Sequence, residues 1–236
     1  PRPPRRRSVC SQARWPSTFA ARSPPTRYGT SRIGRRSTHP PPDPAGYADL
    51  LKAAYPAIKA AAPSALVVAA GLGSVVDHAM ITMDPVKFVS GGMYTAGARN
   101  FFDALAFHPY QYSMKFSESW HPDAPLNQLS EIRRVMLANG DGEKKIWATE
   151  YGEPSSEVGE KAQAEYLDDM LGTWRSLSYA GPVYVYTMRD RNSDSREPDD
   201  TLGIFRSDGT PEGCAERGDV LPGMPDVGEG AIPAPR

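Results

Sequence analysis

The chain has 236 residues, of which 39% are hydrophobic, and a formal net charge of −1. This length allows one large domain or two small ones. No apolar run approaches the roughly 18 residues of a membrane span, and no signal-peptide pattern follows the N-terminal arginines. The two cysteines, Cys10 and Cys214, have no metal-ligand spacing, so the sequence predicts neither a metal site nor a cofactor.

The two ends of the chain differ in composition from its middle. Residues 1–42 are rich in arginine and proline and contain no lysine and no carboxylate, and residues 213–236 repeat glycine and proline without a period. Such segments bury too little apolar surface to offset the entropy lost on ordering. The sequence therefore predicts disordered tails over 1–42 and 213–236, and one foldable region over 43–212.

Helix and strand patterns alternate through the foldable region. Asp43-Pro44 is a typical helix start, with a capping carboxylate followed by proline, and short continuous apolar runs are typical of buried parallel strands. In chain order we expect a helix over 43–62, a strand over 65–70, a weaker helix over 85–99, a strand over 101–107, a helix from Leu126 to Met136 closed by Asn139-Gly140, a strand over 145–149, a helix over 160–177 and a strand over 182–187.

Four strands with a helix in each gap predict an α/β fold with a parallel sheet. Such units make either half of a (β/α)8 TIM barrel or a small doubly wound sheet. The sequence contains no G-x-G-x-x-G motif and no P-loop, which removes the usual reason to expect a nucleotide-binding sheet. A complete barrel needs about 250 residues, so about the last four βα units of a barrel fit in the foldable region.

In a barrel, catalytic groups lie at the carboxyl ends of the strands. Here those ends carry Gly71, then His108 and Tyr110, then Glu150, and finally Arg189-Asp190. Glu150 is the most informative of them, because a carboxylate directly after an apolar strand is costly to hold unless something uses it. We expect Glu153 to face solvent on a Gly-Pro loop, and Asp190 to form salt bridges with its neighbouring arginines.

Several segments resemble one enzyme group. Ile146-Trp147-Ala148-Thr149-Glu150-Tyr151-Gly152 is similar to the seventh-strand nucleophile segment of the barrel clan that contains glycoside hydrolase families 5 and 39. The match continues over residues 43–211: 103–110 resembles the sixth strand of that clan, 181–190 its eighth strand, and 206–211 its closing turn.

The resemblance implies a retaining glycoside hydrolase with Glu150 as its catalytic nucleophile, acting on an oligo- or polysaccharide. His108 and Tyr110 would hydrogen-bond the sugar or the nucleophile, and Trp147 and Tyr186 would offer rings to the C–H face of the sugar. Trp147 is equally compatible with a place in the core. The loop residues Trp120-His121 are weaker candidates for substrate contact. Related enzymes are commonly exported, although this N-terminus carries no visible signal.

One part of the resemblance is missing. The clan places its acid/base glutamate in an Asn-Glu-Pro motif shortly before the helix that starts near Asp43, and this sequence contains no Asn-Glu pair. General acid help is worth about 10²–10⁴-fold, so we expect this chain to be essentially inactive. Half a barrel also exposes two parallel strand edges and half a core, so we expect the chain to be marginally folded. The alternative is a non-catalytic carbohydrate-binding remnant of a barrel. A basic arm could also bind nucleic acid, but no nucleic-acid motif accompanies it, so no such partner is predicted.

The arginine- and proline-rich start suggests a test at the level of the gene. We hypothesise that the segment before about Pro42 is translated out of frame, a truncated paralogue being the alternative. Reading the upstream DNA in the other two frames should then reveal a strand pattern ending in Asn-Glu-Pro. If neither frame contains that motif, the hypothesis is wrong.

Overall fold

The computed structural model describes residues 41–78 and 81–213. The tails predicted to be disordered, 1–42 and 213–236, lie outside this part of the chain except for positions 41, 42 and 213. Cys10 and Cys214 lie outside it as well.

Four parallel strands form one sheet, and their order in space is their order in the sequence. This arrangement confirms the predicted α/β class and the parallel sheet. The carboxyl ends of all four strands therefore meet at one edge. The strands are β1 (Val68–Gly73), β2 (Ala104–His108), β3 (Ile146–Tyr151) and β4 (Ala180–Val185).

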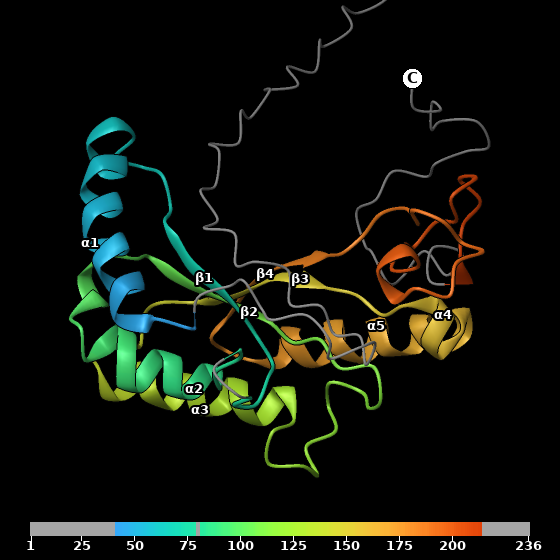
Figure 1. The fold of residues 1–236 in the computed structure, drawn as a ribbon, viewed down its shortest axis with the longest axis horizontal. Coiled ribbons are helices and arrows are strands. Elements are labelled where there is room, and N and C mark those ends of the chain that lie inside the picture. The colour runs from blue at the N-terminus through green and yellow to red at the C-terminus, as the bar shows by residue number, and fades with distance from the viewer. Residues whose placement is uncertain (1–40, 79–80, 214–236) are drawn as a thin grey trace, which may run out of the picture.

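Helices lie between the strands in the order of the chain. In Figure 1, α3 and α5 lie below the sheet. The predicted start of the first helix is confirmed: the Gly46 amide donates to the Asp43 carboxylate at 2.9 Å, and Pro44 is the first helical residue. The α-helices are α1 (Pro44–Ala61), α2 (Pro85–Lys87), α3 (Pro125–Ala138), α4 (Ser155–Val158) and α5 (Glu160–Ser176), and the shorter turns are η1 (Phe88–Tyr94), η2 (Ala98–Asn100) and η3 (Pro198–Asp200).

The single weaker helix expected over 85–99 is wrong. The segment breaks into α2, a π-helical turn and a 3-10 turn. Glycine favours such a break because it is a poor helix former, and Gly92 also lies against α1. A Cβ atom on Gly92 would be 2.0 Å from the Pro44 Cβ, so this turn follows the packing of α1 rather than a regular helical path.

The strand predicted over 101–107 starts later, at Ala104. Phe101 ends the preceding 3-10 turn, and Phe102 is buried in the core without belonging to a strand. Asp103 fixes the point where β2 begins: its carboxylate accepts from the Val67 amide and from the Tyr55 hydroxyl, both at 2.8 Å. An apolar run alone does not separate strand from other buried backbone.

The two faces of the sheet carry different side chains. The main core lies on the helix side and includes Ile146 and Ala148 of β3, whereas the intervening Trp147 packs on the other face. Small residues dominate that second cluster, which consists of Val68, Ala104 and Ala106. Alternate side chains along the strands therefore pack on opposite faces of the sheet. This packing is consistent with part of a barrel whose helices lie outside.

The segment after β4 is held by a buried pair of carboxyl groups. Asp190 and Glu212 are 4% and 1% exposed. Asp190 accepts from the Gly203 amide at 2.7 Å, and burial, followed by the hydrogen bond with Asp190, raises the pKa of Glu212 to about 7. The expected salt bridges of Asp190 are wrong, because Arg191 pairs with Asp200 instead, at 3.1 Å.

This pair predicts a pH dependence of stability. Because the pKa of Glu212 is raised from 4.5 to about 7 on folding, its contribution is complete below pH 4.5 and is lost as pH rises through about 7, on the order of 1 kcal/mol per pH unit at most. Glu212→Gln should flatten this fall in chemical denaturation, whereas Glu157→Gln, at an exposed position, should not. Equal slopes in the wild type and in Glu212→Gln would contradict the assignment.

Candidate active site

The ends of β2 and β3 bring an acid, an imidazole and a phenol together. Glu150 lies near the end of β3, and its Oε2 atom is 3.7 Å from His108 Nδ1 and 3.5 Å from the Tyr110 hydroxyl. His108 Nε2 lies 2.7 Å from Thr149 Oγ1. The imidazole ring is thus held between Thr149 and Glu150, and one carboxylate oxygen is approached from two sides. The Glu150 side chain stays 46% exposed.

The two neighbours of Glu150 are uncharged at neutral pH. Burial lowers the pKa of His108 below its ordinary 6.5, against the opposing effect of Glu150. Burial, and next the charge of Glu150, raise the pKa of Tyr110 well above its ordinary 10. Tyr110 therefore keeps its proton and can donate it to Glu150 in a hydrogen bond.

Aromatic contacts fix the ring of Tyr110. It stacks on the buried ring of Tyr151 at a centroid distance of 6.3 Å and an angle of 25°. It also meets the rings of His108 and Tyr112 edge-on. Such geometries suit aromatic pairs, so the hydroxyl that faces Glu150 is carried by a ring packed on three sides.

Two glycines make room for the close approach of the strand ends. A Cβ atom on Gly71 of β1 would lie 2.3 Å from His108 Nε2, so the imidazole occupies the space that a side chain would need. A Cβ atom on Gly152 would lie 1.8 Å from the Tyr186 carbonyl oxygen. Tyr186 is drawn to β3 by its own amide, which donates to the Tyr151 carbonyl at 2.7 Å.

The structure separates the two aromatic residues expected to contact sugar. Tyr186 follows β4 and is 40% exposed, and its backbone hydrogen bond to Tyr151 places it beside the end of β3. Trp147 lies earlier on β3. It packs on the second face of the sheet and stacks on Tyr184 at 6.4 Å. Trp120 is 72% exposed in the loop between β2 and α3, where its ring meets His121.

Sequence reasoning missed the role of Tyr151 and placed Glu153 wrongly. Glu153 does not face solvent: it is fully buried, and its Oε1 accepts from the Tyr151 hydroxyl at 2.8 Å. Burial raises its pKa to about 8. The spacing between Tyr151 and Glu153 held a signal for the burial of Glu153. Residues two apart in extended backbone point to the same side, and Tyr151 is a core position.

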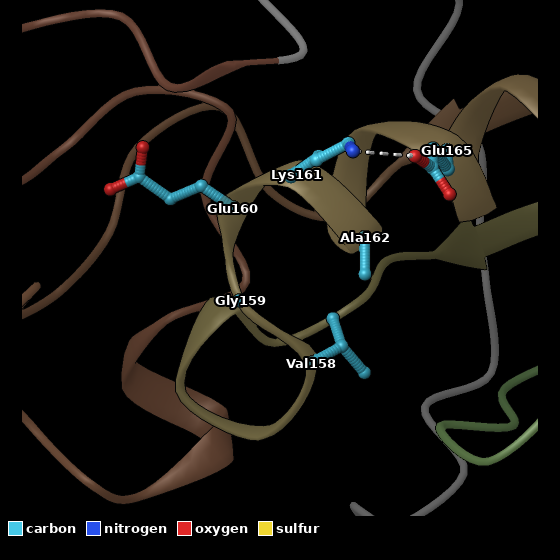
Figure 2. A pocket seen from close by; sticks show the side chains of 6 residues that line it. All are labelled: Val158, Gly159, Glu160, Lys161, Ala162 and Glu165. Atoms are coloured by element: carbon cyan, nitrogen blue, oxygen red, sulfur yellow. Dashed lines mark ion pairs between the residues drawn. The ribbon is translucent and has the colours of Figure 1, made fainter.

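A separate hollow of about 470 Å³ opens at the start of α5 (Figure 2). It is lined by Val158, Gly159, Glu160, Lys161, Ala162 and Glu165, and Lys161 lies 4.0 Å from Glu165 across one helical turn. None of the strand-end residues lines it, so the hollow is not part of the candidate site.

Two absences concern only the part of the chain that the structure describes. Within it, no group of three or more His, Cys, Asp or Glu side chains is arranged to hold a metal ion. Over the same residues, no helix combines the length and the apolar character needed to cross a membrane.

Comparisons with known proteins give matches at the level of structure. No protein-family model matches the chain, and no curated protein does. The structure is similar to a family 39 glycoside hydrolase from the gut symbiont Bacteroides cellulosilyticus, with 21% identity and a TM-score of 0.57 over 73% of this chain and 36% of that one. It is also similar to a glucosidase from Croceicoccus marinus, with 16% identity and a TM-score of 0.50 over 72% of this chain and 34% of that one.

A family 2 β-galacturonidase from Eisenbergiella tayi matches less well, with 16% identity and a TM-score of 0.49, over 72% of this chain and 28% of that one. The two better matches show a likeness of fold: the described residues are similar to part of the fold of a family 39 glycoside hydrolase and of a glucosidase. The chain spans about a third of the length of each of these solved structures.

The space at Gly71 gives a prediction for the geometry of the site. Gly71→Ala should push the imidazole of His108 away from Thr149 and toward water, so the pKa of His108 should rise toward 6.5 because burial is what lowers it. Titration of the histidine ring protons by NMR measures this shift.

Gly91→Ala is the matched control, because a Cβ atom there meets nothing within 4 Å. If His108 titrates in Gly71→Ala as it does in Gly91→Ala, the proposed contact between Gly71 and the imidazole is wrong.

Proposed function

We propose that the chain is a glycoside hydrolase by descent, of the retaining type, with Glu150 as its nucleophile. One observation carries the proposal: Glu150 stands at the carboxyl end of a strand in a glycosidase-like parallel sheet, and both the Tyr110 hydroxyl and the His108 ring approach its Oε2 atom. Catalytic groups of barrel enzymes occupy this edge of the sheet.

The arrangement suits attack on an anomeric carbon. A hydrogen bond from Tyr110 to Oε2 orients the carboxylate and leaves its other oxygen, Oε1, to form the new bond. As that bond forms, the glycosidic C–O bond breaks and the leaving oxygen takes up a proton. Water then attacks the glycosyl ester and releases the sugar with its configuration retained. A neutral His108 keeps a second donor or acceptor beside the reacting carboxylate.

Among the residues that the structure describes, none is placed to give the leaving group its proton. In retaining enzymes the acid/base carboxyl stands about 5–5.5 Å from the nucleophile, and the sequence lacks the Asn-Glu pair that would supply it. Glu153 does not fill the role, because its buried carboxyl is bonded to Tyr151. We therefore propose that the chain forms a glycosyl-enzyme only from substrates whose leaving group needs no proton.

A carbohydrate is the proposed partner, as an oligo- or polysaccharide, and the sugar is left open. The neighbouring structures are described as a glucosidase and as a β-galacturonidase, so their sugars differ. The alternative is a non-catalytic carbohydrate-binding remnant. The exposure of Trp120, Tyr184 and Tyr186 favours it, because such rings bind sugars without any chemistry at Glu150.

Dinitrophenyl glycosides distinguish a catalytic chain from a non-catalytic carbohydrate-binding one, because dinitrophenolate leaves without a proton. With a panel of glucosides, xylosides and galactosides, the full chain should release one equivalent of phenolate in a burst and then turn over slowly. Added azide should speed the second step and yield a glycosyl azide of retained configuration. Glu150→Gln should abolish the burst.

Glu157→Gln, at an exposed position outside the site, is the matched control and should keep the burst. Circular dichroism shows whether each variant is folded. Sugar binding by a folded chain with no burst from any glycoside would favour the non-catalytic alternative.

A further inference from the structure

A chain of direct contacts leads from a buried acid to the candidate nucleophile. The Glu153 carboxyl accepts from the Tyr151 hydroxyl at 2.8 Å. The Tyr151 ring stacks on Tyr110 at 6.3 Å, and the Tyr110 hydroxyl faces Glu150 at 3.5 Å. We propose that Glu153 is a positioning residue for Glu150, acting through Tyr151 and Tyr110. The proposal rests on the proposed role of Glu150 as nucleophile.

Glu153 is fixed in place by its surroundings. Its side chain is fully buried, and its backbone carbonyl accepts from the side-chain Nε2 of Gln163 on α5 at 2.9 Å. Gln163 is itself bound at a second point, the Gly203 carbonyl, at 2.9 Å. Glu153 therefore lies where α5, the end of β3 and the segment after β4 meet. These elements fix its position, and its hydrogen bond in turn fixes the position of the Tyr151 hydroxyl.

The charge state of Glu153 follows from what faces it. Tyr151 comes from β3 and Tyr166 from α5, while Asp169, also on α5, faces Tyr151. None of these three side chains is a cation, and the Oε2 atom of Glu153 has no hydrogen-bond partner among the described residues. An ionised carboxylate left unpaired in such a site is strongly unfavourable. Burial accordingly raises its pKa to about 8, so the neutral acid is the resting form.

The contact with Glu150 is sensitive to small movements of Tyr151 and Tyr110. A separation of 3.5 Å between Tyr110 and Glu150 is at the long limit of a hydrogen bond. When Glu153 ionises, its carboxylate gains by reaching water, and Tyr151 is drawn with it. The stacked ring of Tyr110 then moves away from Glu150, and a misplaced group of this kind slows the chemical step.

The first test is the pH profile of the phenolate burst in the full chain. The wild-type burst rate should fall as pH rises through about 8, the pKa of Glu153. Glu153→Gln keeps a neutral acceptor for Tyr151, so it should keep the rate and lose the fall. Glu153→Ala should lower the burst rate on the order of tenfold, with little change in the substrate concentration that gives half the maximal rate.

The second test needs no activity. In tyrosine-labelled protein, the NMR signal of the Tyr110 ring, assigned with Tyr110→Phe, should shift as Glu153 titrates and should not shift in Glu153→Gln. Glu157→Gln should behave as the wild type in both tests. This measurement tests whether Glu153 positions the Tyr110 ring even if Glu153→Ala fails to fold.

The outcomes are distinguishable. No burst from the wild-type chain overturns the proposed function, and the Tyr110 signal then still decides whether Glu153 controls that ring. A Tyr110 signal that ignores the titration of Glu153, or a burst in Glu153→Gln that still falls above about pH 8, overturns the positioning role.

Discussion

Parallel pairing in sequence order is the constraint on which the candidate site depends. It delivers the carboxyl end of every strand to one edge of the sheet, so residues far apart in the chain, Gly71, His108 and Glu150, become neighbours. Close approach then requires small residues, and Gly71 and Gly152 leave the space that His108 and the Tyr186 carbonyl occupy. The chemistry follows from the packing, because burial keeps His108 and Tyr110 uncharged beside a carboxylate.

The sequence was sufficient to predict four strands and a parallel sheet, because alternating helix and strand signals are local patterns. Apolar runs predicted the strands, and the polar residues at the ends of those runs made His108, Tyr110 and Glu150 candidates for a site. Element boundaries were less predictable. Phe102 was assigned to a strand because a buried apolar residue looks the same in a strand and in a core loop, and the backbone there is set by contacts of Asp103 with distant residues.

The burial of Glu153 and Asp190 was not predicted from the sequence. Glutamate and aspartate are almost never fully buried unless paired, so Glu153 and Asp190 were expected to face solvent or arginine. Their surroundings come from α5 and from the segment after β4, which no local pattern connects. The result is a second layer behind the strand ends, in which Glu153 and Glu212 hold protons near neutral pH and join the end of β3 to the rest of the fold.

In the proposed mechanism, the Glu150 carboxylate forms a bond to an anomeric carbon. Mass spectrometry after incubation with a fluoroglycoside that carries a good leaving group tests it most directly, because such a reagent needs no acid assistance and its ester hydrolyses slowly. We expect one glycosyl adduct, mapped by fragmentation to Glu150 and absent from Glu150→Gln. A folded chain that remains unlabelled, or an adduct on another residue, would contradict it.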